Sequence, residues 1–122
     1  MLSDNDSAAI VAVKNLAEAK DFYANTLGLP LVKGDDNVLE FETGDTSLIV
    51  YVSEFAGTNQ ANAVVWGVGK AFDAIIADLQ AKGVVFEHYD MMERDGDVHL
   101  AGDFKAAWFK DPDGNLLHLN NM

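Results

Sequence analysis

The chain has 122 residues, of which 49% are hydrophobic and 10% aromatic, and twenty Asp and Glu outnumber eight Lys and Arg to give a formal charge of −12. This size and composition predict one globular domain, spanning 1–122, and not a disordered segment. The negative charge disfavours nucleic acid and membrane surfaces as partners, and the absence of cysteine excludes disulfides, thiolate nucleophiles and cysteine-bound zinc. No apolar run is long enough to cross a bilayer, and Met1–Asp6 lacks the features of a signal peptide, so we expect a soluble cytoplasmic protein.

The first half of the chain predicts one strand, one helix and three further strands. Residues 8–13 are a short apolar run rich in β-branched side chains, which is typical of a strand covered on both faces. Asn15 is a typical helix N-cap with Glu18 at the third helical position, and Gly28 ends the helix. The three strand candidates that follow are separated by a polar loop and a tight Gly44-Asp45 turn; they are 29–33, 38–43 and 46–52.

The second half repeats the same order after a polar linker at 53–62. Residues 63–68 predict a strand, and apolar side chains at helical spacing predict a helix over 71–82 that Gly83 ends. The strand candidates that follow are 84–90 and, after a polar loop, a hairpin formed by 104–110 and 116–120 around the turn Asp111-Pro112-Asp113-Gly114-Asn115.

Two βαβββ units in one chain indicate an internal duplication. Module one covers about 8–53 and module two about 63–120, and one helix per sheet is too little for either half to bury its own core. The sequence therefore predicts an α+β domain in which the two modules share one core.

This order, together with Leu16-Ala17-Glu18-Ala19-Lys20-Asp21-Phe22-Tyr23 and Trp108-Phe109-Lys110-Asp111-Pro112-Asp113-Gly114-Asn115, resembles the vicinal oxygen chelate superfamily of glyoxalases, bleomycin-resistance proteins and extradiol dioxygenases. The resemblance covers nearly the whole chain. It implies that the two modules form a cup-shaped mixed sheet with the helices outside, and that the cup holds a ligand.

The resemblance also places the metal-ligand positions of the enzymatic members. They fall at Ala8, at Val64, at Ile49 or Tyr51, and at His118, and of these only His118 is an ordinary ligand for zinc, iron or manganese. One imidazole cannot form a site that needs several ligands. The sequence therefore predicts no metal and no other cofactor.

Side chains alternate between the two faces of a strand, and the metal-ligand positions mark the face that lines the cup. Together they predict which side chains line the cup. The tight turn at 44–45 pairs Glu42 with Ser47, Glu40 with Ile49 and Val38 with Tyr51, and the last turn pairs Trp108 with His118. Aromatic rings and carboxylates on one apolar face can bind a flat or cationic organic molecule. The predicted ligand-binding residues are Glu40, Glu42, Tyr51, Trp66, Phe104, Trp108 and His118.

Each of these residues has an ordinary structural alternative. The two Trp and Tyr51 are also typical core residues, and His118 is also typical of a buried histidine with satisfied ring nitrogens. A shift of one residue in the hairpin would turn Glu40 and Glu42 to the opposite face. His88 and His99 are interpreted as surface residues, and Met91 and Met92 as either part of a lid or core filler.

We therefore expect a metal-independent binding or sequestration protein of the bleomycin-resistance type, with an aromatic or cationic ligand and, by the same resemblance, a homodimer. The alternative is an enzyme of the glyoxalase-like isomerase, lyase or dioxygenase kind. It is either a metal-free isomerase or lyase in which His118 and Glu40 or Glu42 act as acid and base, or a metalloenzyme whose ligands lie at other positions than those assigned above. A third alternative is an accessory domain with no small-molecule role. No catalytic residue is assigned, because no serine lies in a nucleophile elbow and no glycine-rich phosphate loop is present.

Overall fold

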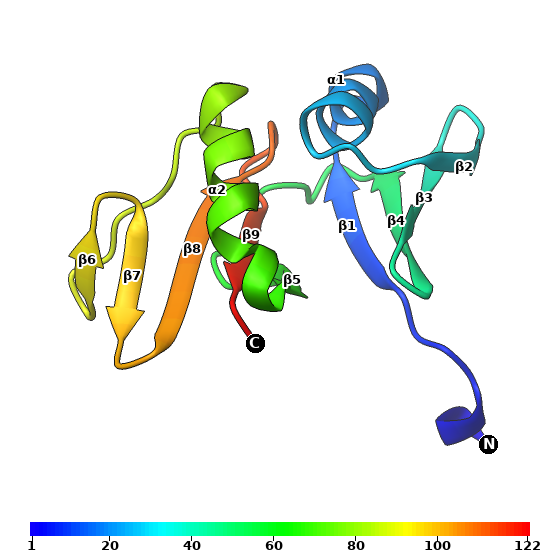
Figure 1. Cartoon of the computed structure of the whole chain (residues 1–122). Coiled ribbons are helices and arrows are strands. Elements are labelled where there is room, and N and C mark those ends of the chain that lie inside the picture. Colours follow the sequence, from blue (N-terminus) through cyan, green and yellow to red (C-terminus); the bar gives the residue numbers. More distant parts are fainter.

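The computed structural model describes residues 1–122 as two mixed β-sheets with one main helix on each (Figure 1). The first sheet has the strand order β1-β4-β3-β2 and the second β5-β9-β8-β7-β6. The strands are β1 (Ala9–Val13), β2 (Leu31–Gly34), β3 (Val38–Thr43), β4 (Thr46–Val52), β5 (Asn62–Gly67), β6 (Glu93–Asp95), β7 (Val98–Ala101), β8 (Phe104–Lys110) and β9 (Leu116–Asn120). No helix is both long and apolar enough to span a bilayer.

The first sheet has the register that the sequence predicts. The Gly44-Asp45 turn pairs Glu42 with Ser47 and Glu40 with Ile49 across β3 and β4. β1 lies parallel to β4 on its other side, with Ile10 opposite Ile49. Because side chains alternate along a strand, Ile10, Glu40 and Ile49 lie on one face and the buried Phe41 on the other.

In the second sheet, the part that lies on the side of β8 away from β9 differs from the prediction. The segment 84–90 is not a strand; it contributes one isolated bridge, between Phe86 and Phe109. The predicted polar loop instead contains the hairpin β6–β7, whose register joins Asp95 to Val98. Gly96-Asp97 is the two-residue loop between these strands, and a glycine-containing loop of two residues is a hairpin signal that sequence reasoning missed.

Both predicted helices form, with one difference of geometry. α1 (Leu16–Asp21) begins at Asn15, whose side-chain oxygen accepts a hydrogen bond from the Glu18 amide at 3.0 Å. It continues as the π-helix η2 (Phe22–Thr26), not as α-helix, and the chain leaves it through Leu27 and Gly28. α2 (Phe72–Ala81) follows the short 3-10 turn η3 (Gly69–Ala71), and a further turn, η1 (Leu2–Asp4), lies at the N-terminus.

The two modules share one hydrophobic core. The largest cluster of buried apolar side chains takes members from both sheets and both helices, including Val11, Tyr23, Phe41, Phe72 and Phe109. The sheet side that carries this core is called the helix face below, and the opposite side the open face.

The Asp-Pro-Asp-Gly-Asn turn joins module two to module one. Buried Asp111 accepts a hydrogen bond from the Tyr23 hydroxyl at 2.8 Å, and the Asn115 amide donates to the Ala12 carbonyl at 2.7 Å. Asp113 accepts from the Lys14 backbone amide at 3.0 Å. The motif therefore holds two modules together, besides closing the last hairpin.

Candidate functional site

The open face carries a band of side chains that crosses both sheets. Strand register places Glu40, Ile49 and Ile10 side by side on the first sheet. On the second sheet it places Val65, His118 and Trp108 side by side. β1 and β5 contact each other where the sheets meet, so the band passes from a carboxylate, over aliphatic side chains, to an imidazole and an indole.

The middle of this band is apolar and open to solvent. Ile10 and Val65 are 60% and 57% exposed, although both belong to strands. Tyr51 lies on the same face, two residues further along β4 than Ile49. It pairs with Ala12 and Val38 and is half-buried. Exposed apolar side chains that adjoin polar groups are typical of a surface that binds a ligand or a partner.

The indole end of the band is built on Trp108 and His118. Their rings stack with centroids 4.6 Å apart and an angle of 21° between planes, so the predicted pairing is confirmed. The Trp108 indole N–H donates to the Asn62 side chain at 3.0 Å. The His118 ring is held between the Ala107 carbonyl, 3.2 Å from Nδ1, and the Asn120 amide, 3.3 Å from Nε2.

The indole end of the band is covered by a segment of the same module that includes Tyr89 and Met92. Tyr89 packs edge-on against Trp108 at 5.3 Å, and Met92 and Phe104 pack against the same small cluster. Trp108 and His118 are consequently only 7% and 8% exposed. In a single chain, the indole end is therefore closed by Tyr89, which sequence reasoning did not assign to the site, and by Met92, for which a lid was one of two interpretations.

His99 is not a surface residue, which corrects the sequence interpretation. β7 pairs it with Ala106 on the open face, where it is fully buried and lies edge-on to Trp108 at 4.9 Å. Its Nε2 atom accepts a hydrogen bond from the Tyr89 amide at 2.9 Å, which anchors the covering segment. His88 is exposed and pairs with Asp97 at 2.7 Å, as expected for a surface residue.

Burial makes both histidines of this cluster poor bases. Burial lowers the pKa of His118 below the ordinary value of 6.5, and the hydrogen bond to the Ala107 carbonyl opposes this only in part. Burial likewise lowers the pKa of His99, and the positive charge of Arg94 lowers it further. At neutral pH both rings are therefore uncharged, and the indole end of the band carries no imidazolium.

Trp66 does not lie on the open face, contrary to the sequence prediction. An irregularity in the β5–β9 pairing between Asn62 and Val64 shifts the alternation, so Val65 pairs with His118 and Trp66 with Leu119. Trp66, which was expected in the cup, therefore packs on the helix face against the main core, as does Val68.

The acid and base of the enzyme alternative are not brought together within one chain. Glu40 lies on β3 and His118 on β9, with β4, β1 and β5 between them. The ring nitrogens of His118 contact Ala107 and Asn120, not a carboxylate.

The side chains at the family's metal-ligand positions do not fit a metal. Ala8 has no ligand atom, and Val64, paired with Leu117, faces the core. Nowhere in the chain do three or more His, Asp and Glu side chains come together as a ligand cluster. The ring nitrogens of His118 already lie within hydrogen-bonding distance of protein groups, so the site has no multi-ligand set.

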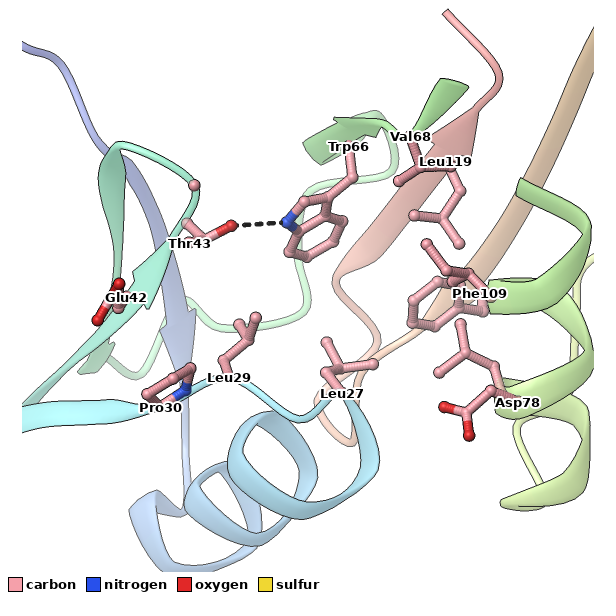
Figure 2. A pocket seen from close by; sticks show the side chains of 13 residues that line it. Leu27, Leu29, Pro30, Glu42, Thr43, Trp66, Val68, Asp78, Phe109 and Leu119 are labelled. Carbon is pink, nitrogen blue, oxygen red and sulfur yellow. Dashed lines mark hydrogen bonds between the residues drawn. The ribbon is translucent and has the colours of Figure 1, made fainter. Parts of the chain in front are cut away.

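A cavity lies on the helix face of the sheets, away from this band. It has a volume of about 400 Å³ and is lined by residues of both modules, among them Leu29, Thr43, Trp66, Asp78 and Phe109 (Figure 2). None of Tyr51, Trp108 and His118 lines it. Sequence reasoning missed this cavity because its walls come from separate segments of both modules.

The comparisons with known proteins agree with this architecture. The family model of the Glyoxalase/Bleomycin resistance protein/Dioxygenase superfamily matches residues 7–119, and the chain belongs to that superfamily. A glyoxalase/bleomycin resistance protein from Streptomyces sp. CB03234 is 25% identical, with a TM-score of 0.68 over 95% of this chain and 99% of that one.

Two further solved structures share the fold at lower identity. A glyoxalase/bleomycin resistance protein/dioxygenase from Alicyclobacillus acidocaldarius has a TM-score of 0.75 at 20% identity, over 96% of this chain and 90% of that one. A lactoylglutathione lyase from Agrobacterium tumefaciens has a TM-score of 0.73 at 15% identity, over 95% and 92% of the two chains.

Proposed function

We propose that this chain is a metal-independent binding protein that holds a small, flat organic cation on the open face. The observation that carries the proposal is the band from Glu40, over exposed Ile10 and Val65, to His118 and Trp108. A planar ligand gains apolar contact along the middle of this band, and its charge is attracted to the carboxylate end. Tyr51 and Glu42 extend the same surface, because Tyr51 lies two residues from Ile49 on β4 and Glu42 two residues from Glu40 on β3.

The lost metal ligands favour binding over the chemistry of the enzymatic relatives. A lyase, isomerase or dioxygenase of this superfamily type would need a ligand set that Ala8 and Val64 do not provide. The imidazole of His118 has a lowered pKa and no carboxylate partner, so it lacks the usual features of a general base. Sequestration requires neither feature.

The segment that includes Tyr89 and Met92 then controls the access of a ligand to Trp108. In the free chain Tyr89 and Met92 close the indole of Trp108 from solvent, so stacking of a ligand on that ring requires Tyr89 and Met92 to move aside. The carboxylate and aliphatic parts of the band need no such movement, because they are exposed or half-buried. A ligand can therefore bind first at the Glu40 end and reach Trp108 afterwards.

A matched pair of three-ring dyes tests the proposal. Equilibrium dialysis at low salt should show saturable binding of 9-aminoacridine, a planar cation, and little binding of 9-anthracenecarboxylate, a planar anion of similar size. Glu40→Gln should weaken cation binding about 2- to 5-fold, as expected for one exposed charge. Lys33 faces Glu40 across β2 and β3 without forming an ion pair, so it leaves the carboxylate available.

The control is Glu18→Gln, which removes the same charge from exposed α1 on the helix face. It should leave the affinity for 9-aminoacridine nearly unchanged. Equal binding of the two dyes, or an equal effect of the two variants, would show that the acidity acts only as a general field and would count against a site on this face.

A further inference from the structure

We propose a second binding site on the helix face, in the cavity between the modules, for a small flat hydrophobic molecule that is neutral or carries an amine. This site is separate from the open face, because strand alternation points Trp66, Phe109 and Leu119 away from Val65, Trp108 and His118. Neither proposal requires the other.

The cavity has the size and lining of a small-molecule site. Its volume of about 400 Å³ falls in the range of about 300 to 1,000 Å³ that ligand pockets occupy. Eight of its thirteen lining residues are hydrophobic. Leu27 and Leu29 line it directly after the π-helix η2 (Figure 2). Ile75 and Leu79 of α2 line it as well.

Trp66 supplies a fixed aromatic wall. Its indole N–H donates to the Thr43 hydroxyl at 3.0 Å, a bond that joins β5 of module two to β3 of module one (Figure 2). The ring is only partly buried although it packs against the main core, so part of its surface remains free. A flat apolar ring can stack on this free surface without breaking the bond to Thr43.

The charges around the cavity decide which ligands fit. No Lys, Arg or His lines it, whereas Asp78 of α2 lies at one edge (Figure 2). Glu42 borders the opposite edge, but strand alternation puts its side chain on the open face. Asp78 forms an exposed ion pair with Lys82 at 3.2 Å. An anionic ligand would find no cationic residue in the lining, while an amine can approach the exposed Asp78 carboxylate, so the site favours neutral and cationic molecules.

The two Trp residues of the chain report separately on the two faces. Trp66 lies on the helix face and Trp108 on the open face, so their indole N–H signals in ¹H–¹⁵N NMR spectra distinguish the two sites. Titration with 2-naphthylmethylamine or 2-naphthylmethanol should shift the Trp66 signal saturably, and 2-naphthoate should shift it far less. The signals are assigned with Trp66→Phe and Trp108→Phe.

Ile75→Trp tests whether the ligand occupies the cavity itself. The larger side chain fills the space from half-buried α2, and affinity should fall about tenfold or more. Ala77→Trp, on an exposed position of the same helix, should leave the affinity unchanged.

Three outcomes would overturn the inference. The first is a Trp66 signal that does not move while that of Trp108 does, which would support the open-face function alone. The second is an equal response in the wild-type chain and in Ile75→Trp. The third is a Trp66 signal that shifts with protein concentration in the absence of ligand, because a second chain would then cover the cavity.

Discussion

At the scale of single residues, the hydrogen bond from Tyr23 to Asp111 is the most informative contact in the molecule. Both side chains are buried, and they belong to different modules. Burial, together with the negative charge of Asp111, raises the pKa of Tyr23 far above its ordinary value, so the phenol stays protonated and donates. Asp111 also accepts three hydrogen bonds from within its own turn. One comes from the Asp113 backbone amide, and two come from the backbone and side-chain amides of Asn115.

We predict that Tyr23→Phe lowers the free energy of unfolding by about 1.5 to 3 kcal/mol, since it removes a buried hydrogen bond to a charged group. Urea unfolding followed by circular dichroism measures the change. Tyr51→Phe is the control, because no hydrogen bond from the Tyr51 hydroxyl is formed, and it should change stability by less than about 0.5 kcal/mol. Equal losses in the two variants would contradict this account of the turn.

The buried histidines predict how stability depends on pH. Because the pKa values of His99 and His118 are lowered in the folded state, the unfolded chain binds more protons once the pH falls below about 6.5. The free energy of unfolding should therefore decrease between about pH 6.5 and pH 5. Asp97, whose pKa is lowered chiefly by its hydrogen bond to His88, affects stability only at a lower pH, near and below its ordinary value of 3.8.

Thermal unfolding at half-unit pH steps measures this dependence, and His118→Asn should make the decrease shallower. A melting temperature that stays constant or rises between pH 6.5 and pH 5 would mean that the two rings are more accessible to protons than their burial indicates.

At the scale of elements, the linker between the modules is restricted at Gly57. Its φ angle is +77°, and a Cβ atom there would overlap the Asp113 carbonyl oxygen of the last turn. The linker therefore packs closely against the turn that joins the modules. Gly96 has a φ angle of +61°, but a Cβ atom there would meet no other atom within 4 Å, so this position isolates the backbone effect.

We predict that Gly96→Ala lowers stability by about 1 kcal/mol through backbone strain alone. Gly57→Ala should cost about 1 to 3 kcal/mol more, because the overlap with Asp113 must also be relieved. Chemical denaturation of the two variants gives the difference directly, and equal losses would show that the linker can move away from the turn.

The strands also show where sequence reasoning succeeds. Tight turns fix register, so the pairing of Glu40 with Ile49 and of Trp108 with His118 could be deduced from the positions of Gly44-Asp45 and Asp111–Asn115. The face of Trp66 could not be deduced. β5 is joined to β9 by a long connection, and the irregularity after Asn62 has no sequence signal. A shift of one residue there moved Trp66 to the other side of the sheet.

The predicted site shows the same limit. Glu40, Glu42 and Tyr51 share a face as predicted, and so do Phe104, Trp108 and His118. The covering by Tyr89 could not be predicted, and a lid at Met92 was only one of two interpretations, because both residues lie in a segment that is neither helix nor strand. Periodicity gives information only within regular elements.

At the scale of the whole molecule, the exposed apolar middle of the band suggests association of two chains, which the family resemblance also leads us to expect. We predict a homodimer in which each chain covers the other's open face. Light scattering should return twice the 13.2 kDa of one chain. Burial of the band within that dimer would complete the walls of the proposed open-face site.

Val65→Asp should shift the equilibrium toward single chains, because it places a charge on the open face. Val85→Asp is the matched control, since Val85 is 79% exposed in the segment after α2. A mass of one chain at high wild-type concentration, or dissociation by the control as readily as by Val65→Asp, would rule out this arrangement.

The position of β9 within the second sheet has a consequence for synthesis on the ribosome. β9 lies between β5 and β8, yet residues 116–120 are made after every other strand. Until they emerge, β5 has no strand partner, and the last hairpin, whose turn accepts the hydroxyl of Tyr23 through Asp111, is not closed. The nascent chain must therefore wait for its last strand before module two and its junction with module one are complete. Interruption of translation before that point should yield a protease-sensitive product and not a half-sized folded domain.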